Sequence, residues 1–176
     1  MFECFQPAMQ ITSVEKISVE ELFEAGIKGL IIDLDNTVTR WNELVVEEKV
    51  ALWLGRVKKE GIQACVVSNN KKKSRVATVA DYLDVPYVFR ATKPRRRAFL
   101  EAMKMMGTGA ENTAVIGDQL FTDVLGGNRL HLYTILVAPI SDHEFAGTKI
   151  LRMGERVLWW LMKKPASANS NSPKFP

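Results

Sequence analysis

Carboxylates, hydroxyls and an ammonium recur along this sequence, in groups that follow short apolar runs. The set comprises Asp33, Asp35, Thr37, Ser68, Lys93, Asp118 and Asp123. Carboxylates gathered in one place repel one another, and a divalent cation relieves that repulsion; oxygen ligands beside a phosphate suit Mg²⁺. A carboxylate can attack phosphorus to give an aspartyl-phosphate, while a hydroxyl and an ammonium can hold the phosphoryl oxygens. The pattern therefore predicts phosphoryl transfer with Mg²⁺ as the cofactor.

The surrounding sequence predicts the elements that would bring these residues together. Apolar runs predict five strands, and apolar residues at helical spacing predict the helices between them. The strands are predicted over 29–35, 62–68, 86–89, 113–118 and 131–138, and the helices over 19–25, 44–60, 74–83, 95–106, 121–128 and 149–164. Nearly all-apolar strands that alternate with helices indicate a parallel sheet covered on both faces. We therefore expect a doubly wound, Rossmann-like three-layer α/β/α sandwich with a mainly parallel five-stranded sheet, and the polar set at its carboxyl edge.

Length and composition fit one globular domain. The chain has 176 residues, of which 47% are hydrophobic and 25% are charged, so a sizeable core is expected. We predict a single domain over 1–164, with a lead-in at 1–28 that is irregular up to residue 18. The domain would end in an amphipathic helix at 149–164, and the segment 165–176, rich in proline, serine and asparagine, is expected to be disordered.

Cysteine usage, hydropathy and charge bear on location. The two cysteines are Cys4 and Cys65, and Cys65 lies in an apolar run that predicts burial. The amino end has no secretory pattern, and no stretch approaches the roughly 18 to 20 apolar residues that cross a bilayer. These features predict a reduced, cytoplasmic protein, while peripheral attachment to the inner face of the membrane stays open. The net charge of +4 fits an anionic partner but selects none by itself.

The motifs and their order resemble those of the haloacid dehalogenase (HAD) superfamily of phosphatases. DLDNT at 33–37 is similar to the first motif, Ser68 to the second, Lys93 to the third, and GDQLFTD at 117–123 to the fourth. One such motif is a moderate signal, whereas four in register, each after a strand, are a strong one. The stretches VVSNN, ATKPRRRAF and VIGDQLFTDVLGGNR are further similar to the YqeG-type members of family IIIA. Those members are similar to the phosphatidylglycerophosphate phosphatase of mitochondria and plastids.

This resemblance implies a role for each residue of the set. Asp33 would be the nucleophile, and Asp35 the general acid and then the general base. Mg²⁺ would be held by Asp33, Asp118 and the main-chain carbonyl of Asp35. The substrate-binding residues would be Thr37, Ser68, Asn69 and Lys93, with Thr37 also ordering its loop and Asp123 supporting the metal site or the lysine.

Ordinary structural interpretations stay open beside these roles. An aspartate after a strand often forms a turn or caps a helix, so it is the complete set that favours catalysis. Asp123 as a helix cap and Asn69 as a loop former remain alternatives. Two basic clusters, 71–75 and 95–97, follow the second and third motifs. They are either solvated faces or regions that attract an anionic substrate or surface.

The spacing of the motifs leaves no room for an inserted lid domain. Only 30 residues separate Thr37 from Ser68 and 24 separate Ser68 from Lys93, and a predicted helix fills most of each gap. An open site suits a large or membrane-borne phosphorylated substrate, and the resemblance implies dephosphorylation of phosphatidylglycerophosphate. A soluble sugar phosphate, a nucleotide or a phosphoprotein stays an alternative substrate, as does a non-catalytic binding module. Nucleic acid is not an expected partner, contact with an anionic membrane stays open, and no stable protein partner can be predicted.

Overall fold

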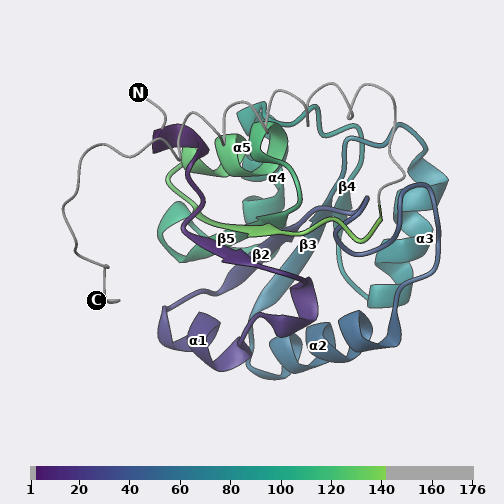
Figure 1. The fold of residues 1–176 in the computed structure, drawn as a ribbon, viewed down its shortest axis with the longest axis horizontal. Coiled ribbons are helices and arrows are strands. Elements are labelled where there is room, and N and C mark those ends of the chain that lie inside the picture. Colours follow the sequence, from purple (N-terminus) through teal and green to yellow (C-terminus); the bar gives the residue numbers. More distant parts are fainter. Residues whose placement is uncertain (1–2, 142–176) are drawn as a thin grey trace.

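Six parallel strands form one open sheet with helices on both faces in the computed structural model, which describes residues 3–141 (Figure 1). The strands are β1 Met9–Ile11, β2 Gly29–Ile32, β3 Gln63–Val67, β4 Tyr87–Val88, β5 Thr113–Gly117 and β6 Tyr133–Val137. The helices are α1 Val19–Glu24, α2 Glu48–Lys59, α3 Lys73–Leu83, α4 Arg96–Met106 and α5 Leu125–Asn128, with a π-helical turn at Leu120–Val124 directly before α5. The doubly wound α/β prediction is therefore confirmed.

The predicted number of strands was wrong, because the sheet has six strands and not five. The additional strand, β1, lies in the segment that the sequence predicted to be irregular, and it pairs in parallel with β6 through Met9↔Ile135 and Ile11↔Val137. Three residues are too few for alternation to give a strand signal. The half-buried side chains of Met9 and Ile11 nevertheless pack at the edge of the core, while the pairing with β6 holds the segment extended.

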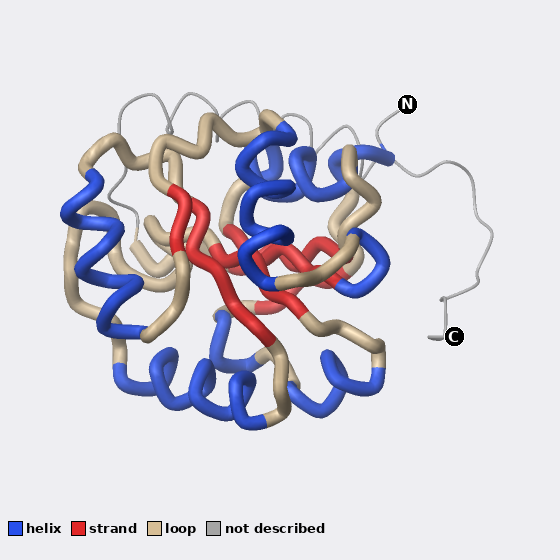
Figure 2. The backbone as a smooth tube through the Cα atoms, turned by 180° about the vertical axis from the view of Figure 1, so that it is seen from behind, coloured by secondary structure: helices blue, strands red, loops and turns tan. Residues whose placement is uncertain are grey.

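Alternation along the strands divides the core into two layers, as expected for a sheet buried on both faces. In β2, Leu30 and Ile32 pack with α1, α2 and α3, whereas Ile31 points to the opposite face, where α4 covers it. The view from behind shows helices on both sides of the strands (Figure 2). On the α2 side, buried Trp53 donates a hydrogen bond from its indole nitrogen to the carbonyl of Ile17 over 2.8 Å, which fixes the lead-in against this layer.

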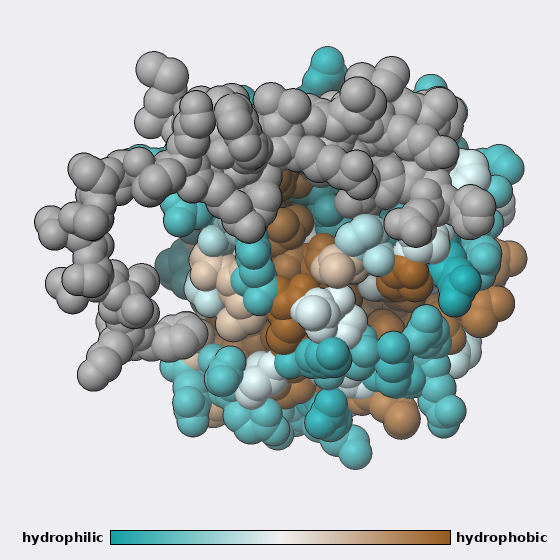
Figure 3. All heavy atoms as spheres, viewed as in Figure 1, coloured by the Kyte–Doolittle hydropathy of each residue, from teal (hydrophilic) through white to brown (hydrophobic). Residues whose placement is uncertain are grey.

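The outer surface is uneven in polarity. Hydrophilic residues line the lower rim in Figure 3, where α1 and α2 lie, and hydrophobic atoms form a band above that rim. Within the residues that the structure describes, no helix is both long and apolar enough to span a bilayer.

Strand order places a ligand-binding edge between β2 and β5. The order is β1-β6-β5-β2-β3-β4, so the chain builds outward from β2 through β3 to β4 and then returns to the other side of β2. In doubly wound sheets, ligands bind at the carboxyl ends of the strands where the order reverses. Here Ile32 is level with Ile116, and the next backbone amide, that of Asp33, donates to the carbonyl of Ile116 over 2.9 Å.

Most element boundaries agree with the sequence prediction within two residues. However, β2 ends at Ile32 and not at residue 35, because the chain turns there and the amides of Val38 and Thr39 donate to the carbonyl of Leu34. Helix α2 begins four residues later than predicted, at Glu48. Val46 is held by an antiparallel bridge to Thr39, so the backbone there is extended and not helical. Only α2 and α3 occupy the connections from β2 to β3 and from β3 to β4, so neither contains an inserted domain. The helix predicted at 149–164 and the tail at 165–176 lie outside the described residues.

Candidate active site

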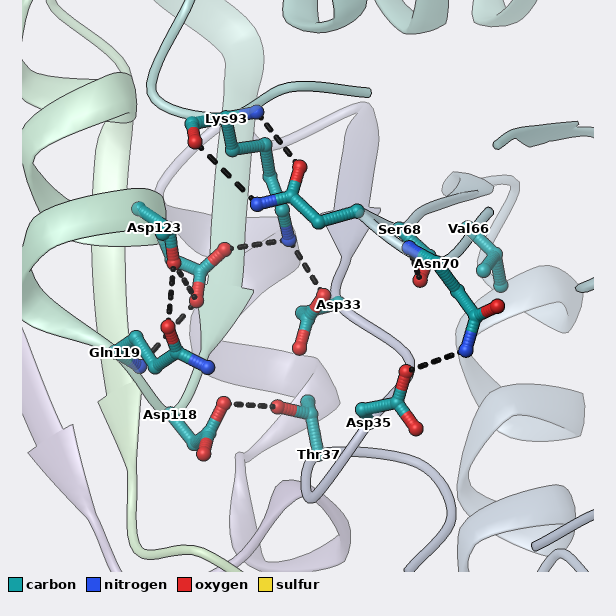
Figure 4. Close-up of polar contacts among 12 residues, drawn as sticks. Asp33, Asp35, Thr37, Val66, Ser68, Asn70, Lys93, Asp118, Gln119 and Asp123 are labelled. Carbon is teal, nitrogen blue, oxygen red and sulfur yellow. Dashed lines mark hydrogen bonds and ion pairs between the residues drawn. The ribbon is translucent and has the colours of Figure 1, made fainter. Parts of the chain in front are cut away.

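The first motif places Asp33 one residue beyond β2, where a buried lysine meets it (Figure 4). Lys93, from the loop after β4, forms an ion pair through its ammonium with Asp33 Oδ1 and a second one with Asp123 Oδ1 over 2.7 Å. All three side chains are buried, with side-chain exposures of 8% or less. The fold therefore brings three residues that are far apart in the sequence into one charged centre.

Asp118 completes this charged centre, which we call the anionic centre and define as Asp33, Lys93, Asp118 and Asp123. One carboxylate oxygen from each of the three aspartates lies within 4.8 Å of the others. Thr37 donates from its hydroxyl to Asp118 Oδ1 over 3.5 Å, which links the first loop to the fourth. Three buried carboxylates face one buried ammonium, so the centre has an excess of negative charge that a divalent cation would neutralise.

The hydrogen bonds that each aspartate accepts indicate which of them are suited to bind such a cation directly. Oδ1 of Asp123 accepts a hydrogen bond from the ammonium of Lys93. Its Oδ2 accepts from the backbone amide of Gln119 over 3.3 Å and from the hydroxyl of Thr122 over 3.2 Å. Both of its oxygens are thus committed within the protein. Asp33 and Asp118 are the better candidates for direct ligands, and Asp123 fits a supporting position.

Burial sets the electrostatics of Asp33 and Lys93. Desolvation raises the pKa of Asp33 to about 7; the Lys93 ammonium opposes this shift, and the Asp123 and Asp35 carboxylates add to it. For Lys93, desolvation lowers the pKa, but the Asp123 and Asp33 carboxylates outweigh it, so the pKa lies above its usual value and the ammonium stays charged. A cation next to Asp33 would favour its ionised, nucleophilic form.

Asp35 lies in a different environment, which we call the Asp35 centre and define as Asp35, Asn70 and Arg75. The side chain of Asp35 is 20% exposed, while that of Arg75 is only 6% exposed. Arg75 contacts Asp35 Oδ1 through Nη2 at 2.8 Å and Asp35 Oδ2 through Nη1 at 3.2 Å. Asn70 donates to Oδ2 over 3.4 Å, and the backbone amide of Asn42 donates to Oδ1 over 3.1 Å. This carboxylate is therefore held from three sides.

Arg75 was not recognised from the sequence as a site residue. It belongs to the basic cluster 71–75, for which the sequence allowed either a solvated face or a region that attracts anions. The structure instead buries it in the first turn of α3, where its Nη2 also donates to the hydroxyl of Thr39 and to the carbonyls of Arg40 and Glu43. A buried guanidinium with these partners orders the loop that carries Asp35.

The residues that follow β3 fix the position of Lys93. The side-chain oxygen of Asn69 accepts from the backbone amide of Lys93 over 2.7 Å, and its nitrogen donates to the carbonyl of Lys93 over 3.3 Å. Asn69 therefore clamps the lysine backbone, a contact that favours positioning over substrate binding. Ser68 is buried, and its Oγ accepts from the backbone amide of Asn70 over 3.1 Å.

Gly117 is required by the close approach of Asp123 to the end of β5. A Cβ atom at position 117 would lie 2.2 Å from Asp123 Cγ, far inside van der Waals contact. The glycine of the fourth motif therefore lets the supporting carboxylate reach Lys93. The motif indicated this position in the sequence, but only the fold shows which side chain needs the space.

Comparisons with known proteins identify relatives of this chain among phosphatases. The HAD-hydrolase-like family model matches residues 90–139. The probable phosphatase YqeG of Bacillus subtilis is 37% identical over 160 residues, which cover 91% of this chain and 92% of the Bacillus protein. The chloroplastic phosphatidylglycerophosphate phosphatase 1 of Chlamydomonas reinhardtii is 27% identical, and the match covers 77% of this chain but 53% of the algal protein. The chloroplastic/mitochondrial protein of the same name from Arabidopsis thaliana is 25% identical, with 78% of this chain and 42% of the plant protein covered.

Solved structures show the same fold. The cobalt-bound deoxy-D-mannose-octulosonate 8-phosphate phosphatase of Haemophilus influenzae superposes with a TM-score of 0.53 at 20% identity, over 80% of this chain and 91% of that protein. A putative HAD family hydrolase of Streptomyces avermitilis gives a TM-score of 0.56 at 18% identity, over 78% of this chain and 75% of that protein.

Proposed function

This chain belongs to the HAD-like phosphatases, and from that premise we propose that it hydrolyses phosphatidylglycerophosphate to phosphatidylglycerol through an aspartyl-phosphate on Asp33, with Mg²⁺ as its metal. The observation that carries the proposed chemistry is the buried contact of Lys93 with Asp33 and Asp123, with Asp118 beside it. It combines a nucleophile, a fixed positive charge and an excess of carboxylates in one buried place.

In the first step, a carboxylate oxygen of Asp33 attacks the phosphorus and the bond from phosphorus to the ester oxygen breaks. The ester oxygen leaves with a proton from the Asp35 carboxyl group, which Arg75 and Asn70 hold in a fixed orientation. Lys93, and Ser68 at the end of β3, hold the phosphoryl oxygens while negative charge shifts among them. The products of this step are the dephosphorylated alcohol and a phosphorylated Asp33.

In the second step, water attacks the phosphorus of the aspartyl-phosphate. Asp35, now ionised, accepts a proton from this water, and the bond from phosphorus to the Asp33 oxygen breaks. Inorganic phosphate leaves, and Asp33 and Asp35 return to their starting states. The ion pair of Lys93 with Asp123 keeps the ammonium in place through both steps.

The residues present fit a hard divalent cation. Asp33 and Asp118 would hold Mg²⁺ through carboxylate oxygens, together with the main-chain carbonyl of Asp35, while Asp123 and Thr37 orient the lysine and Asp118. When bound, the metal would neutralise charge on the phosphoryl group and favour the ionised form of Asp33.

Two observations support a lipid substrate over a small metabolite. The relatives from Chlamydomonas and Arabidopsis carry the name phosphatidylglycerophosphate phosphatase, although the chain spans only about half of their length. The connections after β2 and β3 hold no lid domain, so the protein offers few walls to enclose a small substrate. A phosphate on a lipid headgroup, presented by a membrane, needs no such enclosure.

The test is phosphate release from phosphatidylglycerophosphate in mixed micelles, measured with Mg²⁺ and with a chelator. We expect turnover that the chelator abolishes, and acid-stable incorporation of labelled phosphate into the wild type that Asp33→Asn lacks. A panel of sugar phosphates, nucleotides, phosphopeptides and an aryl phosphate supplies the comparison. A higher kcat/KM on any soluble compound than on the lipid would reject the proposed substrate and retain the phosphatase chemistry.

A further inference from the structure

We propose that the loop 40–47 and the two basic clusters beside it, 71–75 and 95–97, form a docking surface through which the protein binds an anionic lipid membrane. This inference rests on the proposed function, since it concerns how a membrane-borne substrate reaches the site. The structural basis is a loop whose backbone faces the site while its apolar side chains face solvent. We call these side chains, of Trp41, Leu44 and Val45, the apolar tip.

The backbone of the loop is tied to the site at several points. The amide of Asn42 donates to Asp35, and the carbonyls of Arg40 and Glu43 accept from buried Arg75. Val46 is buried and bridges to Thr39. The loop therefore has a defined conformation, and in Figure 1 it runs beside α3 before it enters α2.

Two side chains of the apolar tip are mostly exposed to solvent, and the third, that of Trp41, is partly exposed. Val45 is 72% exposed, Leu44 53% and Trp41 37%. Single exposed apolar residues are common on protein surfaces, but a group of them on one loop beside a functional site marks an interaction surface. An aromatic and two aliphatic side chains on one projection suit the boundary between headgroups and acyl chains.

Basic side chains surround the tip on the same edge of the sheet. The loops after β2, β3 and β4 are joined by hydrogen bonds, including the amide of Arg90 to the carbonyl of Asn70 over 3.0 Å and the clamp of Asn69 on Lys93. The exposed cations of these three loops and of the first turns of α3 and α4 are Arg40, Lys71, Lys72, Lys73, Arg90, Arg95, Arg96 and Arg97. Only Glu43 and Glu47 carry negative charge among the exposed or half-buried side chains of 39–47, 69–75 and 89–97.

The opposite edge of the sheet has no such imbalance. Its turns, together with the last three residues of the helices that precede them, cover 22–28, 57–62, 81–86, 104–113 and 126–132. These segments carry five cations and five anions, namely Lys28, Lys58, Lys59, Lys104 and Arg129, and Glu24, Glu60, Asp81, Asp84 and Glu111. The positive charge is thus concentrated on the edge where the anionic centre lies. An anionic membrane would attract this edge, and the catalytic groups would face the lipid phosphates.

The combination of exposed apolar side chains with surrounding basic side chains favours a membrane over a nucleic acid as the partner. A nucleic acid gains from cations and from stacking on Trp41, but exposed Leu44 and Val45 contribute nothing to such a contact. Hydrocarbon gives both aliphatic side chains a favourable environment. The phosphate-rich surface and the apolar interior of a membrane together match the two kinds of side chain.

The experiment measures binding of the full chain to vesicles of phosphatidylglycerol and phosphatidylcholine, and to pure phosphatidylcholine, by flotation. We expect binding to the anionic vesicles that is weakened at least about tenfold by the triple substitution Trp41→Ser, Leu44→Ser and Val45→Ser. Lys71→Glu and Lys72→Glu should each weaken it by about fivefold or more, and added salt should do the same. Hydrolysis of a soluble aryl phosphate reports whether the triple variant keeps an intact site.

A matched control uses two exposed apolar residues on the far helices, Phe23→Ser in α1 and Leu52→Ser in α2, which are 57% and 64% exposed in the wild type. These variants should bind like the wild type. Equal vesicle binding by the triple variant and the wild type, or tighter binding to a single-stranded nucleic acid than to any vesicle, would overturn the docking surface. If the protein hydrolyses the lipid in micelles but does not bind vesicles, only the docking surface is rejected. If it binds vesicles through the apolar tip but does not hydrolyse the lipid, only the proposed substrate is rejected.

Discussion

Asp33 and Asp35 are identical side chains only two residues apart, yet the fold gives them opposite surroundings. Asp33 is buried among carboxylates and one ammonium, and its pKa is raised to about 7. Asp35 is partly exposed and held by a guanidinium, a side-chain amide and a backbone amide. The difference teaches that neighbours, and not the residue type, set what each carboxylate can do. In the proposed mechanism a cation beside Asp33 would favour its ionised, nucleophilic form, whereas Asp35 is partly exposed and fixed in orientation for proton transfer.

The largest expected effect is the loss of kcat on substitution of Asp33, which, unlike Asp35, would form a covalent bond to phosphorus. Asp33→Asn should lower kcat by about 10⁴-fold or more, because the amide cannot act as the nucleophile. The loss should be the same for aryl and alkyl phosphates, since both need the aspartyl-phosphate. Steady-state assays with both substrates measure it, and Asp81→Asn, on the exposed face of α3, is the control.

Asp35→Asn should give a smaller loss that depends on the leaving group. General acid catalysis contributes about 10²- to 10⁴-fold, and an aryl oxide leaves with little need of a proton. We therefore expect a large loss of kcat on an alkyl phosphate and a clearly smaller loss on an aryl phosphate. Losses that are equal for both leaving groups would break the proposed division of roles between Asp33 and Asp35.

Arg75 tests whether the Asp35 centre needs its guanidinium. Arg75→Ala should lower kcat on an alkyl phosphate by about 10- to 100-fold with KM little changed, because Asp35 loses its orientation. Arg75→Lys should restore part of the loss, since an ammonium keeps the charge but not the two-point contact. Arg56→Ala, on the exposed side of α2, should have no effect. If Arg75 were only a structural residue, heat stability would fall and kcat would follow the folded fraction.

The smallest effect concerns stability and follows from the raised pKa of Asp33. Between its usual value of 3.8 and about 7, the folded protein keeps a proton that the unfolded chain has lost, so stability falls as pH rises across this interval. Each pKa unit is worth about 1.4 kcal/mol, but the substitution also removes the favourable contact with Lys93. In chelator, Asp33→Asn should therefore be more stable than the wild type by about 1–2 kcal/mol at pH 7.5, with little difference at pH 4.

Denaturant unfolding at both pH values gives this difference, and Asp35→Asn is the comparison. That substitution leaves buried Arg75 without its carboxylate, so it should destabilise the protein. A stabilising Asp35→Asn, or a destabilising Asp33→Asn at pH 7.5, would contradict the contrast between the two centres.

The sequence predicted the anionic centre well because its residues follow strands. Each apolar run ends at one edge of a parallel sheet, so Asp33, Lys93 and Asp118 had to converge there once the strands were recognised. Strand β1 was missed because three residues give no periodic signal. The start of α2 was predicted too early because Val46 has helical spacing to Val50, Leu54 and Val57, although a bridge to Thr39 holds its backbone extended.

Arg75 was missed because a run of basic residues usually indicates a solvated face. A signal was nevertheless present, since Arg75 lies four residues before Val79 and eight before Leu83, which are buried on the same side of α3. What no pattern could show is its partner. The carboxylate of Asp35 and the carbonyls of Arg40 and Glu43 meet Arg75 only through the pairing of β2 with β3.

The pairing of β1 with β6 has a consequence for the order in which the protein is made. Met9 pairs with Ile135, so β1 leaves the ribosome long before its partner strand β6 has been made. The contact between Asp33 and the β5 strand likewise waits for residues near 116. We expect a nascent chain that ends before β5 to lack the anionic centre, and one that ends before β6 to keep β1 unpaired and open to aggregation.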